Sequence, residues 1–175
     1  MPEKWMQVAA SCGFTHAAVL DVKTLRPMSM VREACAADKC HAYGKNWTCP
    51  PACGTLEECS AEMAKYSRGI LLQTVGQLAK TIDTKGYAEA AAQHDKHLSS
   101  FAALIRREYP DALCLGAGGC RVCPACAYPA PCRFPEQATS SMEAYGLFVT
   151  QVCRDNGLAY YHGPKTITYT ACVLF

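Results

Sequence analysis

The sequence lacks long hydrophobic runs and clusters of charge of one sign. No stretch reaches the roughly 18 consecutive apolar residues of a transmembrane helix, so we expect no association with a membrane. The 17 Lys and Arg residues are scattered singly and are nearly balanced by 15 Asp and Glu residues, which leaves a formal net charge of +2. A chain without a basic patch is not expected to bind nucleic acid.

The N-terminal segment has no apolar block of the kind found in secretory signal peptides, and we therefore expect a cytoplasmic protein. The chain also has no internal repeat and no low-complexity segment. Its 175 residues, half of them hydrophobic, are enough to bury one core. Residues 1–175 are accordingly predicted to form a single compact domain.

Hydrophobic periodicity predicts an α/β or α+β fold in which helices pack on a small mixed sheet. The expected helices are 3–12, 86–109 and 141–156, and the expected strands are 17–22, 68–75, 112–116 and 166–174. Ser140 or Ser141 would be the N-cap of the third helix, with Glu143 in its first turn. These patterns leave the order of the strands open.

Cysteine is the residue that the chain has in excess, with 13 copies. Disulfide scaffolds belong to small exported domains, whereas clustered cysteines in a reducing compartment indicate a metal site. Two groups stand out, one within residues 35–59 (Cys35, Cys40, Cys49, Cys53 and Cys59) and one within residues 120–135 (Cys120, Cys123, Cys126 and Cys132). The four remaining cysteines are interpreted as small buried hydrophobes: Cys12, Cys114, Cys153 and Cys172. Both groups fall in irregular loops between the expected elements.

The second group has the spacing Cys120-x2-Cys123-x2-Cys126-x5-Cys132. Three cysteines at successive x2 spacings resemble the bacterial ferredoxin pattern and favour a [4Fe-4S] cluster. Zinc is the alternative, although zinc sites usually pair two Cys-x2-Cys units across a longer loop. Because the last cysteine departs from the ferredoxin spacing, its assignment to the same cluster stays open.

The first group matches no common zinc finger. We predict Cys35, Cys40, Cys49 and Cys53 as the ligands of a second [4Fe-4S] cluster, with Cys59 in reserve because it falls where a helix is expected to begin. If one of the four is not a ligand, the cluster keeps an open iron that can bind a substrate. The aromatic side chains in this loop are candidates for shielding the cluster from water.

Several further residues near the second group are candidates for a functional role. Arg121 and Arg133 each follow a predicted ligand, where a guanidinium would raise a cluster's reduction potential or pair with an anionic substrate. The run GAGG at 116–119 would let backbone N–H groups approach the cluster. It lacks the spacing of a nucleotide-binding loop.

Two segments carry a family resemblance: CHAYGKNWTCPP at 40–51 and GAGGCRVCPACAYPAPCRFPEQATSSMEAYGLFV at 116–149. They resemble a family of small cysteine-rich proteins that are predicted to bind metal, have no assigned function, and occur mainly in anaerobic bacteria and archaea. The resemblance extends from about residue 30 to residue 160. It implies iron–sulfur binding and an anaerobic setting, and it implies no particular reaction.

Three functions are compatible with these patterns. In the first, two [4Fe-4S] clusters transfer electrons to a redox protein partner or redox enzyme in anaerobic metabolism. In the second, the protein is an enzyme whose open-iron cluster acts on a small-molecule substrate as a Lewis acid or reductant. In the third, zinc stabilises a binding module. The oligomeric state is open in all three.

Overall fold

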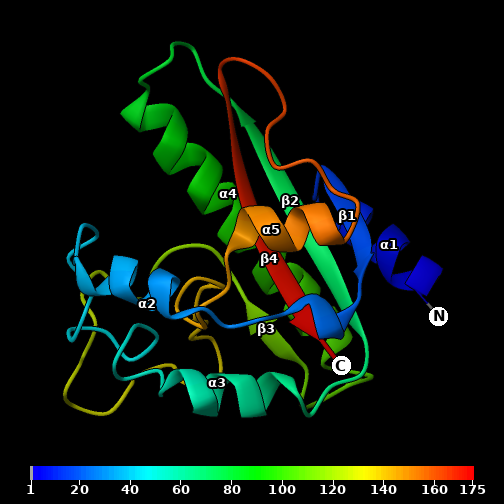
Figure 1. The fold of residues 1–175 in the computed structure, drawn as a ribbon. Helices are drawn as coiled ribbons and strands as arrows, with labels where there is room; N and C mark the ends of the chain where they lie inside the picture. The colour runs from blue at the N-terminus through cyan, green and yellow to red at the C-terminus, as the bar shows by residue number, and fades with distance from the viewer. Residues whose placement is uncertain (1) are drawn as a thin grey trace.

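The computed structural model describes residues 2–175, in which helices and two cysteine-rich segments surround a small sheet (Figure 1). Its centre is an antiparallel sheet with the strand order β1-β2-β4-β3. The strands are β1 (His16–Leu20), β2 (Gly69–Gln77), β3 (Leu113–Leu115) and β4 (Thr166–Leu174). The two long strands, β2 and β4, pair along their whole length.

The helices are α1 (Pro2–Ser11), α2 (Ser29–Ala36), α3 (Leu56–Met63), α4 (Thr84–Ile105) and α5 (Val149–Asp155), together with the 3-10 helix η1 (Val22–Thr24). Side chains that satisfy free backbone N–H groups fix where two of them begin. Asp83 caps α4 by accepting a hydrogen bond from the Gly86 N–H at 3.0 Å. Thr55 and Glu58 form a reciprocal capping box at the start of α3.

Both faces of the sheet are covered, which follows from the alternation of side chains along β2. Ile70 and Leu72 join a core cluster with α1 and α4, whereas Leu71 joins a second cluster with α5 and the turn before it. Figure 1 shows α5 in front of the sheet and α4 behind it. The long strands β2 and β4 are thus mostly buried, while β1 at the edge of the sheet is mostly exposed or half-buried. The cysteine loops extend from this body.

The predicted fold class is confirmed, and the predicted strands and the helices at 3–12 and 86–109 are found with small shifts of their ends. The predicted helix at 141–156 is wrong in its first half, because α5 begins only at Val149. The Ser141 hydroxyl accepts a hydrogen bond from the Ala144 N–H at 3.0 Å, and Gly146 adopts a φ of +78°. This left-handed conformation ends the turn before a helix can propagate.

All 13 cysteines are free thiols. Cys114, Cys153 and Cys172 are buried in the body of the molecule, and Cys12 is partly buried against the core, as expected for cysteines outside a metal site. A separate observation concerns membranes: within residues 2–175, no helix is both long enough and apolar enough to cross one.

Candidate metal centre

The two cysteine loops, about 80 residues apart in the sequence, pack against each other in space. The Trp47 indole N–H donates a hydrogen bond to the Ala130 carbonyl at 2.8 Å, and its ring stands edge-on to Tyr128 at 4.9 Å between centroids. The Cys120 N–H donates to the Thr48 hydroxyl at 3.3 Å. Figure 1 shows these segments, in cyan and yellow, at the same end of the molecule. The two groups therefore belong to one region.

The four thiols of the second group, Cys120, Cys123, Cys126 and Cys132, all line one small cavity. The four sulfur atoms do not converge on one point. In the part of the chain that the structure describes, no three Cys, His, Asp or Glu side chains lie close enough together to hold an ion. Closing the ligands around a metal therefore requires local rearrangement of the loop. Such coupling of metal binding to local folding is common in thiolate sites.

Cys126 has the surroundings of a metal-binding thiolate. The backbone N–H of Tyr128 makes the largest contribution to lowering the pKa of this thiol. The N–H groups of Trp47 and Ala127 and the charge of Arg133 act in the same direction. Because the thiolate is the metal-binding form, these groups favour ligation. Hydrogen bonds of this kind also tune iron–sulfur clusters.

The first group lies directly against the start of the second. Burial raises the pKa of Cys49, and the neighbouring thiols of Cys40, Cys35 and Cys120 raise it further. The Cys49 sulfur lies 3.7 Å from the position that a Cβ atom on Gly119 would take. Cys49 thus has two other predicted ligands of its own loop, Cys35 and Cys40, and one of the second loop, Cys120, in its surroundings.

Cys53 and Cys59 form a hydrogen-bonded thiol pair on the other side of the first group, held by Arg32 of α2. The Arg32 guanidinium lies 3.3 Å from the Cys59 sulfur and 3.7 Å from the Cys53 sulfur, and it also donates to the Gly54 and Ala144 carbonyls. The hydrogen bond from Cys53 and the nearby guanidinium lower the pKa of Cys59 to about 7, against the effect of burial. The pKa of Cys53 is correspondingly raised. Cys59, expected only as a reserve ligand, therefore lies beside Cys53 and has the more acidic thiol.

Glu143 is a second residue that the sequence patterns did not assign to this site. It was expected in the first turn of a helix, but it lies in the turn before α5, where its backbone carbonyl accepts a 3.9 Å hydrogen bond from the Cys35 thiol. Burial raises the pKa of its carboxyl group, whose Oε2 atom has no hydrogen-bond partner among the described residues. Burial raises the pKa of Cys35, and the charge of this carboxylate raises it further.

The two arginines singled out beside the second group have other partners. Arg121 forms a bidentate ion pair with Asp95 of α4, with N···O distances of 2.6 and 2.7 Å. Arg133 donates to the Ala125 carbonyl at 3.3 Å within its own loop. Arg121 thus ties the second loop to the body, while Arg133 stabilises the loop's internal turn.

The donor set of this region suits a thiophilic metal. Nine free thiols, those of the two groups, belong to two segments in mutual contact. Seven of the nine lie in loops as expected, whereas Cys35 lies in α2 and Cys59 in α3. Thiolates of this kind bind zinc or iron–sulfur clusters in preference to hard cations. The region contains a guanidinium and backbone N–H groups that offset the negative charge of several thiolates.

No curated protein and no solved structure matches the chain. One family model matches residues 18–175, a range that includes both cysteine loops, the whole sheet apart from the first two residues of β1, and every helix after α1. That family is described as predicted metal-binding protein (DUF2284), and the chain belongs to it.

Proposed function

We propose that the protein binds two [4Fe-4S] clusters and transfers electrons through them to a redox partner. The ligands of one cluster would be Cys35, Cys40, Cys49 and Cys53, and those of the other would be Cys120, Cys123, Cys126 and Cys132. The observation that carries the proposal is the direct contact between the two cysteine loops, in which Cys49 lies against Gly119 and Cys120. When bound, such clusters supply one-electron redox couples.

Iron–sulfur binding is favoured over zinc by the spacing in the second loop, while the backbone groups around Cys126 favour the thiolate that either metal would bind. Three thiols at successive x2 spacings suit the corners of a cubane. Contact between the loops keeps the two sites adjacent, as electron transfer between them requires. Arg32 would offset the charge of the thiolates at Cys53 and Cys59.

A redox partner would dock at the exposed edge of the second loop. The side chains of Val122 and Phe134 line the same cavity as the four thiols and are 40% and 44% exposed. Aromatic side chains such as that of Phe134 are enriched in the centres of protein interfaces. A partner that covers them would bring its own redox group close to the second cluster.

A second candidate function is an enzyme in which an open-iron cluster acts on a small molecule. The observation that favours it is a cavity of about 400 Å³ beside the second loop, which Cys120 lines. A protein that only carries electrons has no need of such a cavity. In this second function the same thiols would hold the clusters.

The test is the content of iron, acid-labile sulfide and zinc in protein purified without oxygen. About eight iron and eight sulfide per chain are expected, the content of two four-iron clusters. About two zinc and no sulfide, the content of two four-thiolate sites, would contradict the proposal. Cys126→Ser is expected to lose about half of the iron, because it removes one ligand of one four-iron cluster. The matched control is Cys12→Ser, outside both groups, which is expected to keep all of it.

A further inference from the structure

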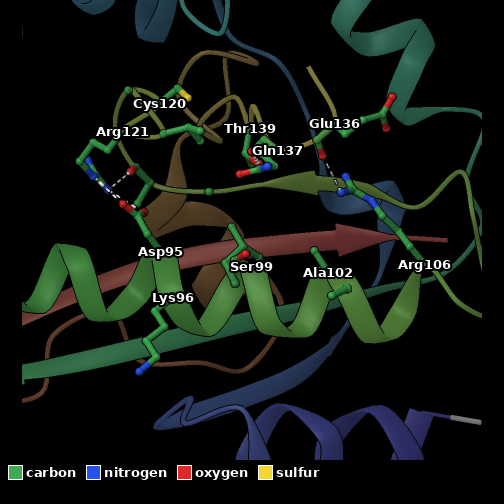
Figure 2. A pocket seen from close by; sticks show the side chains of 17 residues that line it. Asp95, Lys96, Ser99, Ala102, Arg106, Cys120, Arg121, Glu136, Gln137 and Thr139 are labelled. Carbon is green, nitrogen blue, oxygen red and sulfur yellow. Dashed lines mark hydrogen bonds and ion pairs between the residues drawn. The ribbon is translucent and has the colours of Figure 1, made fainter. Parts of the chain in front are cut away.

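A cavity of about 400 Å³ lies between helix α4 and the segments 116–122 and 136–139 (Figure 2). Its volume falls within the range of small-molecule sites in proteins. Cys120 and Val122 line both this cavity and the smaller one shared by the thiols of the second group. A molecule bound here would therefore lie directly beside the second cysteine group.

Small residues line two facing walls of the cavity, among larger polar and charged ones such as Lys96 and Gln137. Helix α4 contributes Ser99, Ala102 and Ala103, and the facing segment contributes the glycine-rich run 116–119. A Cβ atom on Gly116 would lie only 3.1 Å from the Leu98 side chain, so glycine permits the close packing beneath the cavity floor. Small side chains on two opposite walls leave room for the body of a ligand.

Each end of the cavity has an arginine, and only one of the two arginines forms an ion pair (Figure 2). At one end, Arg121 is neutralised by its bidentate ion pair with Asp95. At the other end, Arg106 donates one hydrogen bond to the Glu136 backbone carbonyl at 3.2 Å, and no ion pair within residues 2–175 includes it. A guanidinium has five N–H donors, so Arg106 keeps unused donors for a ligand, although the Glu136 side chain, which forms no ion pair with it, also lines the cavity.

We propose that this cavity binds a small organic molecule bearing a carboxylate or phosphate group, with Arg106 as the residue that binds the anion. A guanidinium recognises either group through paired hydrogen bonds. The rest of the molecule lies against the small residues of α4 and the glycine-rich run. Binding itself does not depend on a metal, and only the reaction of the bound molecule rests on the proposed function.

The experiment is isothermal titration calorimetry on the full chain purified without oxygen, with benzoate, phenyl phosphate and the neutral isostere benzamide as probes. At least one of the two anions is expected to bind on the order of tenfold more tightly than benzamide, the difference expected for a charged hydrogen bond. Comparison of benzoate with phenyl phosphate tells a carboxylate site from a phosphate site.

Two matched pairs of variants locate the site. Arg106→Gln is expected to weaken anion binding on the order of tenfold and to leave benzamide unchanged, whereas Arg107→Gln, at the next residue and outside the cavity, leaves both unchanged. Ser99→Leu fills the cavity and is expected to abolish binding of all three probes. Ser100→Leu is the same substitution on an exposed position that does not line the cavity, and it is expected to have no effect.

The inference is overturned if neither anion binds more tightly than benzamide, or if Arg107→Gln weakens binding as much as Arg106→Gln. It is equally overturned if Ser99→Leu and Ser100→Leu behave alike. Iron, sulfide and zinc are measured on the same samples. Selective anion binding in a protein that holds only zinc would refute the proposed function and leave the anion site standing, so the two failures are distinguishable.

Discussion

The body of the molecule and its cysteine region are ordered by different means. The body consists of the sheet with α1, α4 and α5, and its apolar side chains form clusters on both sheet faces. The cysteine region consists of residues 35–59 and 116–140. None of residues 117–140, all of which the structure describes, is buried. In the segment 35–59, by contrast, five residues are buried: Asn46, Thr48, Cys49, Pro50 and Cys59. The cysteine region is thus held mainly by hydrogen bonds and turns, and hydrophobic burial stabilises it less than the body.

The cysteines show the same contrast. In the body, burial raises the pKa of Cys114 to about 11 and also raises that of Cys172. In the cysteine region, backbone N–H groups lower the pKa of Cys126, and a thiol neighbour with a guanidinium lowers that of Cys59. Cysteine is thus an inert apolar side chain in the body, whereas in the cysteine region Cys59 and Cys126 are favoured as thiolates, although burial raises the pKa of Cys35 and Cys49 there too.

The largest expected effect is a loss of stability in the body that spares the cysteine region. Phe101 is fully buried and packs edge-on against Trp5 and Phe14. Phe101→Ala is expected to lower the free energy of unfolding by about 3 to 5 kcal/mol, because it removes a large core side chain. The measurement is urea unfolding followed by circular dichroism.

Phe134→Ala is the matched control for this change, because Phe134 lies in the cysteine region and is 44% exposed. It is expected to change the free energy of unfolding by about 0.5 kcal/mol or less, as surface substitutions do. Equal losses for the two variants would show that the cysteine region shares the stabilising core, and would remove the distinction drawn between the two regions.

Acid is expected to weaken the body through His94, which is fully buried between α4 and the sheet. Burial, followed by the positive charges of His97 and Arg121, lowers its pKa to about 3 from an ordinary value of 6.5. The unfolded chain therefore takes up a proton below pH 6.5 that the folded chain does not. Stability is complete above about pH 6.5 and falls by about 1.4 kcal/mol per pH unit as the pH drops toward 3.

The variant His94→Gln removes this proton uptake, so its stability is expected to fall less steeply than that of the wild type between pH 6 and pH 4. Urea midpoints across that range provide the measurement. The same substitution at His41, which is exposed in the first cysteine loop, is expected to keep the wild-type slope. Identical slopes for wild type and His94→Gln would mean that acid acts through another group.

The body could be predicted from the sequence because its patterns are local. The strand 166–174 was predicted with the bounds that the structure gives, since a long β-branched and apolar run has few alternatives. The isolated cysteines Cys114, Cys153 and Cys172 were assigned to the core for the same reason. The failure at residues 141–148 has a local cause too: the Ser141 hydroxyl and the left-handed Gly146 favour a turn over the first turn of a helix.

The candidate site was less predictable, because its residues come from segments far apart in the chain. The spacing of the cysteines indicates metal binding, but it does not reveal that Arg32 holds Cys53 and Cys59 together. Nor does it place Glu143 beside Cys35, 108 residues away. Both contacts depend on how α2 and the turn before α5 pack, which no local pattern encodes. The eight ligand assignments themselves stay predictions.

A smaller effect is expected from the contact that joins the two loops. Trp47→Phe keeps an aromatic ring against Tyr128 and loses the hydrogen bond to the Ala130 carbonyl, worth about 1 kcal/mol. The variant is expected to release metal to a chelator faster than the wild type, with an unchanged urea midpoint. Trp5→Phe makes the same substitution in the core, where it is expected to lower the midpoint and leave metal release unchanged. If Trp47→Phe instead lowered the urea midpoint and Trp5→Phe instead sped metal release, the two regions would not be stabilised independently of each other.

The smallest effect is expected at the turn between Cys35 and Cys40, where one carboxylate makes two contacts of different value. Asp38 accepts a hydrogen bond from the Tyr43 N–H at 2.9 Å and another from the Lys45 ammonium at 3.1 Å. Lys45→Met removes only the exposed ion pair and is expected to leave metal release unchanged, since such pairs contribute little. Asp38→Ala is expected to speed metal release modestly, because it also loses the backbone contact and places alanine at a φ of +49°. Asp38→Asn keeps an acceptor and tolerates that conformation, so wild-type release is expected. If Lys45→Met matched Asp38→Ala instead, charge pairing would be what holds this turn.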